Sequence, residues 1–394
     1  MQTGKHQTER PFYVWLAFLT NSILIGAWSS RIPEFKTYFQ TEHGIWGIVL
    51  LTIPLFSLVA SFPTSRFIHR FSLTTTLRVA TLLSLGTFAL IPYTEQLELF
   101  VGVLVLYGFA SGMLNLAMNA AAGAYEHQTG SPIMAASHGM YSFGGMLGAG
   151  LGVVAGSLFW SRTFFFGILA IALLLLNLYL FTVQIPDNPV RTSSSSPKGI
   201  SGYLLLLAVT SFIYMAIEGI ILNWRALFLK SEATTSSGLV SLGFLAFSAT
   251  MTLGRWSGNH FFTRLSVQQV MVGGSTLVMG GFLWLWLVYQ YIPAILAFAL
   301  IGLGASALVP LLFSEATKFV QPAPETAIAV ILTAGISGIM MGSPIIGFAS
   351  EIVGLRNAML IPFFMCGLIL LLHHHFPDYN SSSQVTDKHT NHLT

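Results

Sequence analysis

Apolar runs long enough to cross a bilayer, separated by short polar breaks, fill this sequence from residue 11 to residue 376. A helix needs about 20 mostly apolar residues to cross a hydrocarbon core of about 30 Å. Only 8% of the residues are Asp, Glu, Lys or Arg, whereas a soluble domain carries about 25%. The mean hydropathy is +0.73. The sequence therefore predicts an all-α membrane protein with many spans.

The apolar runs are grouped as six and six around a central polar stretch. The predicted spans are 11–32, 44–64, 74–94, 97–124, 133–158, 162–184, 201–224, 236–258, 267–291, 293–314, 326–349 and 355–376. We predict an N-terminal six-helix bundle over 1–184, a flexible cytoplasmic linker over 185–200 and a C-terminal six-helix bundle over 201–376. The polar residues 377–394 are predicted to form a disordered cytoplasmic tail.

The Lys and Arg residues predict the orientation, because cytoplasmic loops carry an excess of them. With the N-terminus inside, six of the 17 Lys and Arg residues lie on the outer side, namely Arg31, Lys36, Arg162, Arg225, Lys230 and Arg356. The rest are cytoplasmic, so both termini are predicted to be cytoplasmic. These charges form no basic cluster, so no nucleic-acid partner is expected. The single cysteine, Cys366, excludes an intrachain disulfide and a thiolate metal site.

Small residues recur at matching places in the two halves. The fifth span carries Gly144, Gly148, Gly152 and Gly156, and the eleventh carries Gly338, Gly342 and Gly347. Small residues at such spacing let helix backbones approach closely in lipid. Their repetition in two six-span halves indicates a duplicated transporter body. Each glycine taken singly also fits ordinary packing in a membrane bundle.

Short motifs in a fixed order run along nearly all twelve predicted spans. They are Gly26-Ala27-Trp28-Ser29-Ser30-Arg31-Ile32-Pro33, Met118-Asn119 through Glu126, His138 with Ser142-Phe143-Gly144-Gly145, Glu218-Gly219 with Asn223-Trp224, Gly254-Arg255, Pro310-Leu311-Leu312-Phe313, and Gly342-Ser343-Pro344 with Gly347. In these motifs the sequence resembles the major facilitator superfamily (MFS). Within it the chain resembles YbjJ-like bacterial inner-membrane proteins, which are related to the fucose–proton symporter group. The resemblance implies the MFS fold, with 12 transmembrane helices in two six-helix bundles.

The sequence departs from the family pattern at several places. His69 stands where the loop between spans two and three usually has an Asp, although Arg66 and Arg70 remain there as predicted gating residues. Ser29 and Asn115 occupy the places of the acids that relay protons in the fucose symporter group. A proton mechanism therefore does not follow from the resemblance alone. The fifth span also lacks the Gly-Pro pair typical of drug–proton antiporters.

Ionisable side chains inside a membrane are candidates for proton coupling, because a charge there costs about 2.5–3.5 kcal/mol on insertion scales. Glu218 lies well inside the seventh span, and the predicted spans place no basic residue and no other carboxylate at its depth. His138, in the fifth span, is the second candidate, since imidazole titrates near neutral pH. Both also fit a structural, hydrogen-bonded role. Arg255 is predicted at the cytoplasmic end of the eighth span, where it would serve gating or anchoring.

Uncharged polar and aromatic side chains are candidates for solute binding. They are Asn21, Trp28, Asn115, Asn119, Tyr141, Tyr214 and Trp224. The Asn side chains suit a neutral or zwitterionic solute, but they fit hydrogen bonds between helices equally well. Trp28 and Trp224 could stack on a ring, yet a place in the interfacial aromatic belt is the better default.

The most consistent function is secondary transport, in which two bundles alternately open a central cavity. The sequence has no phosphate-binding P-loop, and no spacing that suits an enzyme's nucleophile–base pair. Proton-coupled symport of a small polar solute leads. The alternatives are a proton-coupled efflux antiporter and a non-transporting membrane sensor or scaffold. The expected partners are the solute, protons and the lipid bilayer of the bacterial inner membrane. We predict a monomer with no cofactor and no metal.

Overall fold

A computed structural model describes residues 11–131, 133–183, 201–233, 242–262, 265–316, 318 and 324–376. The predicted linker (185–200) and tail (377–394) lie outside the described residues. The chain divides into two compact units. Unit 1 comprises residues 1–192 and 236–242, and unit 2 comprises residues 193–235 and 243–394. In the described ranges every element is a helix, as a bilayer requires, because a helix bonds its own backbone groups.

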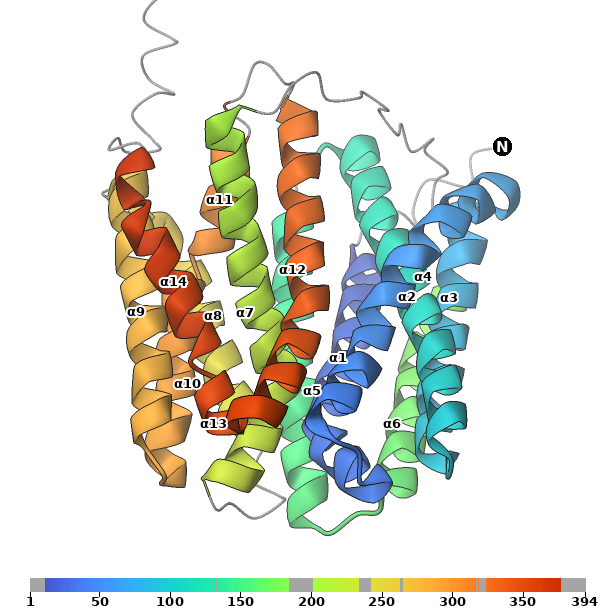
Figure 1. Cartoon of the computed structure of the whole chain (residues 1–394). Helices are drawn as coiled ribbons and strands as arrows, with labels where there is room; N and C mark the ends of the chain where they lie inside the picture. The colour runs from blue at the N-terminus through green and yellow to red at the C-terminus, as the bar shows by residue number, and fades with distance from the viewer. Residues whose placement is uncertain are drawn as a thin grey trace, which may run out of the picture. The chain divides into compact units, whose positions relative to one another are not determined.

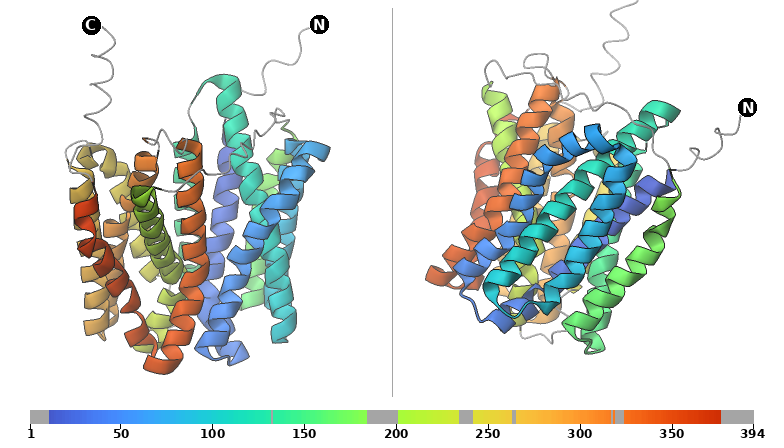
Figure 2. Two further views of the ribbon diagram at one scale, coloured as in Figure 1. Left: turned by 45° about the horizontal axis from the view of Figure 1, so that its top comes forward. Right: turned by 90° about the vertical axis from the view of Figure 1, so that its right-hand side faces the viewer.

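Unit 1 is built from antiparallel helices joined by short turns. They are α1 (Phe12–Phe39), α2 (His43–Phe71), α3 (Leu73–Leu90), η1 (Ile91–Tyr93), α4 (Leu97–Thr129), α5 (Met134–Ser157), α6 (Arg162–Asn177) and η2 (Leu178–Phe181). Helix α1 packs along α5, while α4 packs along both α2 and α3 (Figures 1 and 2). Ser72 and Ser161 cap the starts of α3 and α6 with their hydroxyl oxygens.

Unit 2 repeats this order with two interruptions. Its helices are α7 (Gly202–Glu232), α8 (Leu242–Phe262), α9 (Val267–Leu287), α10 (Tyr291–Ala305), α11 (Leu308–Ala316), α12 (Pro324–Val353), α13 (Leu355–Ala358), α14 (Ile361–Leu371) and η3 (His373–His375). The predicted continuous span 293–314 is broken between α10 and α11, and the predicted last span is divided into α13 and α14. Helix α7 packs along α12, and α9 packs along α10 and α14 (Figure 1).

The helices occupy all twelve predicted positions. Within the described residues, eight helical segments are long and apolar enough to cross a membrane, and the shorter apolar helices Arg162–Asn177 and Leu355–Leu371 occupy the sixth and twelfth positions. Helices α5 and α8 fill the remaining two. Several helices continue past the predicted ends, as α1 does to Phe39. The predicted ends lie where the apolar residues stop, whereas the backbone hydrogen bonds of the helix continue into the residues that follow.

Glycines set the closest helix contacts in both units. In unit 1, a Cβ atom built on Gly144 would lie 2.7 Å from the carbonyl oxygen of Leu19 on α1. In unit 2, a Cβ atom on Gly342 would lie 2.7 Å from the carbonyl oxygen of Ala216 on α7. Real Cβ atoms essentially never approach other atoms so closely. These positions therefore require glycine, because the partner helix backbone occupies the space of a side chain.

Corresponding glycines of unit 1 and unit 2 are separated by the same number of residues along the chain. Gly148 faces Ile23 of α1 as Gly342 faces Ala216 of α7, and Gly108 faces Ile53 of α2 as Gly302 faces Phe247 of α8. The pair Gly148 and Gly342 is as far apart in sequence as the pair Gly108 and Gly302. The two units therefore share one helix-packing scheme, as expected for a duplicated body.

Arg356 in α13 ties together the ends of two helices of unit 2. Its Nη1 donates to the carbonyl oxygens of Val288 at 2.6 Å and Trp286 at 3.0 Å, just at the end of α9. Its Nη2 donates to the backbone oxygen of Glu232 at 2.8 Å, and its Nε pairs with the Glu232 carboxylate at 3.2 Å. One guanidinium thus satisfies carbonyls that the helix ends leave without partners.

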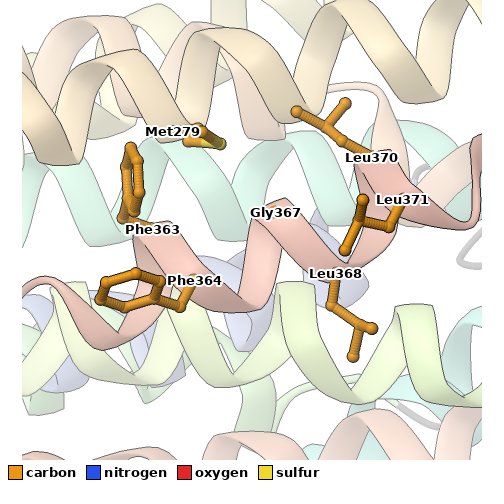
Figure 3. A pocket seen from close by; sticks show the side chains of 7 residues that line it. All are labelled: Met279, Phe363, Phe364, Gly367, Leu368, Leu370 and Leu371. Atoms are coloured by element: carbon orange, nitrogen blue, oxygen red, sulfur yellow. The ribbon is translucent and has the colours of Figure 1, made fainter.

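The surface of unit 2 over α9 and α14 is apolar, as contact with hydrocarbon allows. Figure 3 shows a shallow groove between α9 and α14, lined by Met279, Phe363, Phe364, Gly367, Leu368, Leu370 and Leu371. Phe364 is 67% exposed and Leu371 is 74% exposed. These exposed side chains are apolar, whereas the exposed side chains of the candidate site are polar or charged.

Candidate functional site

Glu218 lies near the middle of α7 and forms an ion pair with Arg255 of α8. The Nη2 atom of Arg255 donates to Oε1 of Glu218 at 3.1 Å. The expectation that no basic residue lies at the depth of Glu218 is therefore wrong. It failed because the predicted eighth span ended at 258, whereas α8 continues to Phe262 and holds Arg255 about 10 Å before its end. Arg255 is thus a counter-charge for Glu218 rather than an end-of-helix anchor.

Arg225, the other arginine of this region, is engaged elsewhere. It is completely buried, and its Nη1 donates to the carbonyl oxygens of Ile221, at 2.8 Å, and Leu222 on its own helix. Its guanidinium lies over the ring of Phe244 at 4.0 Å from the centroid. Carbonyl oxygens and an aromatic face stabilise this buried cation.

Both members of the Glu218–Arg255 pair are partly open. The Arg255 side chain is 34% exposed and the Glu218 side chain is 25% exposed. Charges exposed to hydrocarbon would be several kcal/mol too costly, so charged residues inside spans face a bundle interior or a water-filled cavity. The exposure of this pair therefore marks a face of unit 2 that meets water at membrane depth.

Unit 1 carries uncharged polar groups on an open face of α4. Asn115 is exposed, Asn119 is half-buried, and both lie within the span. The Nδ2 atom of Asn119 donates to Oδ1 of Asn115 at 2.9 Å and to its backbone oxygen at 2.8 Å. The predicted pairing of these residues on one face is thus present, since residues four apart are neighbours on a helix. The Asn115 amide retains hydrogen-bonding groups for a solute.

His138 and Tyr141 lie on consecutive turns of α5. His138 is exposed, and its ring meets the edge of Phe18 with centroids 5.3 Å apart. Tyr141 is half-buried, and its backbone oxygen accepts a hydrogen bond from the hydroxyl of Ser22 on α1. The structure brings both predicted residues to the surface of unit 1, and their roles remain predictions.

Four of the predicted solute-binding residues are buried inside their units. Asn21 is 0% exposed, and its Oδ1 accepts from Ser111 at 2.9 Å, so it ties α1 to α4. The hydroxyl of Tyr214 bonds that of Ser275, which ties α7 to α9. For Asn21 the structure supports the alternative of a hydrogen bond between helices, and Tyr214 makes a bond of this kind as well.

The two tryptophans are also interior. Trp28 is 4% exposed and packs against Phe35 and Phe100, with ring centroids 5.5 Å and 6.0 Å away. Trp224 is completely buried. Neither ring is exposed in this structure, and the predicted role in solute binding stays a prediction. Helix position placed them near an interface, but only tertiary packing shows that both rings point inward.

The predicted gating residues of unit 1 lie at the end of α2. Arg66 and Arg70 are exposed, and the guanidinium of Arg70 lies 5.4 Å from the ring centroid of Phe71. Their gating role is untested by this arrangement and stays a prediction.

A second carboxylate, the buried Glu315 at the end of α11, was not expected. It is 1% exposed, pairs with Lys318 at 2.5 Å and accepts from the hydroxyl of Tyr203 at 3.2 Å. The predicted span 293–314 ended one residue short of it. Lys318, three residues later, could have indicated this ion pair, because residues three apart share a helix face. Its partners enclose it, so Glu218 remains the accessible carboxylate of the two.

The described residues contain no group of three or more His, Cys, Asp or Glu side chains placed to hold a metal ion. The exposed faces carry the hydrogen-bonding groups of Asn115 and His138 in unit 1 and the Glu218–Arg255 ion pair in unit 2. Such groups bind and release a solute or a proton. A repeated helical body that holds charges open to water at membrane depth belongs to the class of polytopic solute transporters.

Comparison with known proteins gives the family. Residues 12–330 match the Major Facilitator Superfamily. An uncharacterized MFS-type transporter of Yersinia pestis is 30% identical over 365 residues, which cover 91% of this chain and 92% of that protein. The chain therefore belongs to the Major Facilitator Superfamily and is a secondary transporter, not an enzyme. The predicted family and transporter class are confirmed.

Solved structures share the fold at low sequence identity. A mutant of the nucleoside transporter NupG superposes with a TM-score of 0.77 at 13% identity, over 92% of this chain and 98% of that chain. A D-xylose–proton symporter superposes with a TM-score of 0.75 at 12% identity, over 94% of this chain and 98% of that chain. These likenesses confirm the predicted MFS fold with its twelve helices.

Proposed function

We propose that this transporter moves a small polar solute by alternating access together with protons, with Glu218 as the main proton-exchanging group. The observation that carries the proposal is the partly exposed Glu218–Arg255 ion pair at membrane depth. A carboxylate in contact with water can take up a proton, and doing so releases Arg255. Protonation of one side chain then changes the charge of this face of unit 2, which is the kind of local event that biases a two-state protein.

The solute is proposed to bind through Asn115, Asn119 and Tyr141 of unit 1, with His138 as a second binding or proton-relay group. These groups are open, and Asn amides both donate and accept hydrogen bonds. The structural neighbours lend support, since one is a nucleoside transporter and another a D-xylose–proton symporter. We also propose that the chain belongs to the YbjJ-like branch, related to the fucose–proton symporters.

Proton coupling predicts a pH change inside proteoliposomes when the solute is added outside. Wild-type protein is reconstituted with a trapped pH-sensitive dye, and sugars, nucleosides, amino acids and organic acids are added in turn. A transported solute is expected to acidify the lumen under symport, because each cycle carries a proton inward. Alkalinisation would identify an antiporter instead. A solute that enters, as shown by radiolabel, without any pH change would overturn the coupling.

We propose that the protein acts as a monomer in the bacterial inner membrane, with both termini cytoplasmic. Two exposed turn residues of unit 1 test this orientation, Thr129 at the end of α4 and Ser161 before α6. Intact cells expressing Ser161→Cys should be labelled by an impermeant maleimide, and cells expressing Thr129→Cys should be labelled only after lysis. Native Cys366 is buried, so the unmodified protein serves as the unlabelled control. The reverse pattern would invert the topology.

A further inference from the structure

Among the contacts of the described residues, the Arg255 guanidinium has spare hydrogen-bonding capacity. Glu218 accepts from one of its nitrogens, Nη2, and its Nε is buried without a hydrogen-bond partner among the described residues. A guanidinium has five N–H donors in a planar fork that matches a carboxylate through two parallel hydrogen bonds. The observed contact is a single bond through one oxygen of Glu218. Arg255 is therefore able to bind a second acceptor, or a carboxylate in better geometry.

Other titratable groups described on the helices that pack against α7 either pair with other residues or lie near a helix end. Glu315 of α11 is paired with Lys318 and with Tyr203, near the start of α7. Arg356 of α13 is paired with Glu232, at the end of α7. Glu351 lies near the end of α12, and the buried thiol Cys366 of α14 lies near Tyr214, whose hydroxyl bonds Ser275. Arg255 is thus the charged group that faces Glu218 in the described structure.

Protonation of Glu218 leaves Arg255 with an uncompensated charge. Arg255 is partly exposed, so the loss of its partner costs less than in a fully buried pair, but the guanidinium is left partly desolvated and without its counter-charge. An anion that binds Arg255 at that moment restores neutrality. By linkage, a proton on Glu218 and an anion on Arg255 then favour each other's binding.

We propose that the transported solute carries a carboxylate group, and that this carboxylate replaces Glu218 at Arg255 when Glu218 is protonated. This inference rests on the proposed function, since it names the chemistry of the solute at the same ion pair. Proton and carboxylate together add no net charge to the site, so the pair cycles between Glu218–Arg255 and solute–Arg255 contacts.

The test uses matched probes that differ in the carboxylate. Purified full-length protein is titrated with L-lactate or L-lactamide, and with D-gluconate or D-glucose, at about pH 5.5 and about pH 8, where such carboxylates are ionised. Binding is measured by calorimetry and by the shift in Tm. We expect lactate or gluconate to bind and its neutral partner to bind at least about tenfold more weakly, the usual effect of losing a charged hydrogen bond. Wild-type binding should be tighter at the lower pH.

Three variants test whether carboxylate binding depends on Arg255 and on the charge of Glu218. Glu218→Gln should bind the carboxylate more tightly than wild type at about pH 8 and equally at both pH values, because the neutral amide never compensates the charge of Arg255. Arg255→Gln and the double variant E218Q/R255Q should lose carboxylate binding; the double variant, with two neutral amides, guards against misfolding of the single one. Glu98→Gln, an exposed change at the start of α4, is the matched control and should behave as wild type.

The proposal is overturned if neutral probes bind as well as carboxylates, if binding survives in E218Q/R255Q, or if Glu218→Gln responds to no carboxylate probe. Equal binding by wild type at both pH values would overturn it as well. Failure of proton coupling gives a different result: carboxylates bind at Arg255 more tightly at the lower pH, but a solute enters proteoliposomes without any change of the internal pH. The two proposals therefore fail separately.

Discussion

Glu218→Gln is expected to abolish solute accumulation driven by a proton gradient while solute exchange continues. Glutamine has the shape of a protonated glutamate and is permanently neutral, so it cannot release a proton on either side of the membrane. Its amide oxygen can still accept a hydrogen bond from Arg255, which lies 3.1 Å from the carboxylate in the wild type. Solute binding and the conformational cycle should persist, whereas their link to the proton gradient is lost.

The measurement is uptake of a radiolabelled solute into proteoliposomes under two conditions. With an inward proton gradient, the variant should bring the internal concentration no higher than the external one. In counterflow, with unlabelled solute inside and no gradient, it should exchange at a rate near that of wild type. Glu218→Asp keeps an acid on a shorter side chain and should retain part of the accumulation, and Glu98→Gln should retain all of it.

Full accumulation by Glu218→Gln would remove Glu218 from the coupling mechanism and leave His138 as the candidate. Loss of both accumulation and counterflow, together with a lower Tm, would show that the ion pair is needed for folding. Arg255→Lys helps to distinguish these cases, because it keeps the charge without the planar fork. It should preserve folding and weaken coupling.

Gly148→Ala is expected to destabilise unit 1, although alanine is normally the better helix former. A Cβ atom at this position would overlap the carbonyl oxygen of Ile23 and lie 2.9 Å from the backbone nitrogen of Ala27. Both obstacles are backbone of α1, so no rotamer change relieves the contact and the two helices must separate. Overpacking of this kind costs about 1–3 kcal/mol, which corresponds to a Tm decrease of roughly 2–6 °C.

A second glycine of the same helix provides the matched control. A Cβ atom added at Gly150 would meet no atom within 4 Å, so Gly150→Ala should leave Tm unchanged or raise it slightly through helix propensity. Gly338→Ala in unit 2 should repeat the loss, because its Cβ would lie 3.0 Å from the Ala216 nitrogen. Thermal unfolding of the purified variants, followed by circular dichroism, measures all three. Equal Tm values for Gly148→Ala and Gly150→Ala would show that α1 and α5 are not in backbone contact.

Relations within one helix could be predicted from the sequence, because the period of a helix places them. Asn115 and Asn119 were expected on one face, and they are hydrogen-bonded to each other. The glycines of the fifth and eleventh predicted spans were expected to allow close packing, and four of them, Gly144, Gly148, Gly338 and Gly342, meet the backbones of α1 and α7. The twelve spans themselves follow from the length of the apolar runs.

Relations between helices were decided only by the tertiary structure. Glu218 and Arg255 lie on different helices, and a few residues of uncertainty in a helix end, at about 1.5 Å per residue, hid their common depth. Asn21, Trp28, Tyr214 and Trp224 have the composition of binding residues, but packing turns them inward. Which residues form the spans and how the spans repeat could be predicted from the sequence, because hydropathy and helical period are local properties. Which of them meet water and which charges pair depended on the rotation and depth of each helix against its neighbours, and these are set by side-chain packing across the bundle.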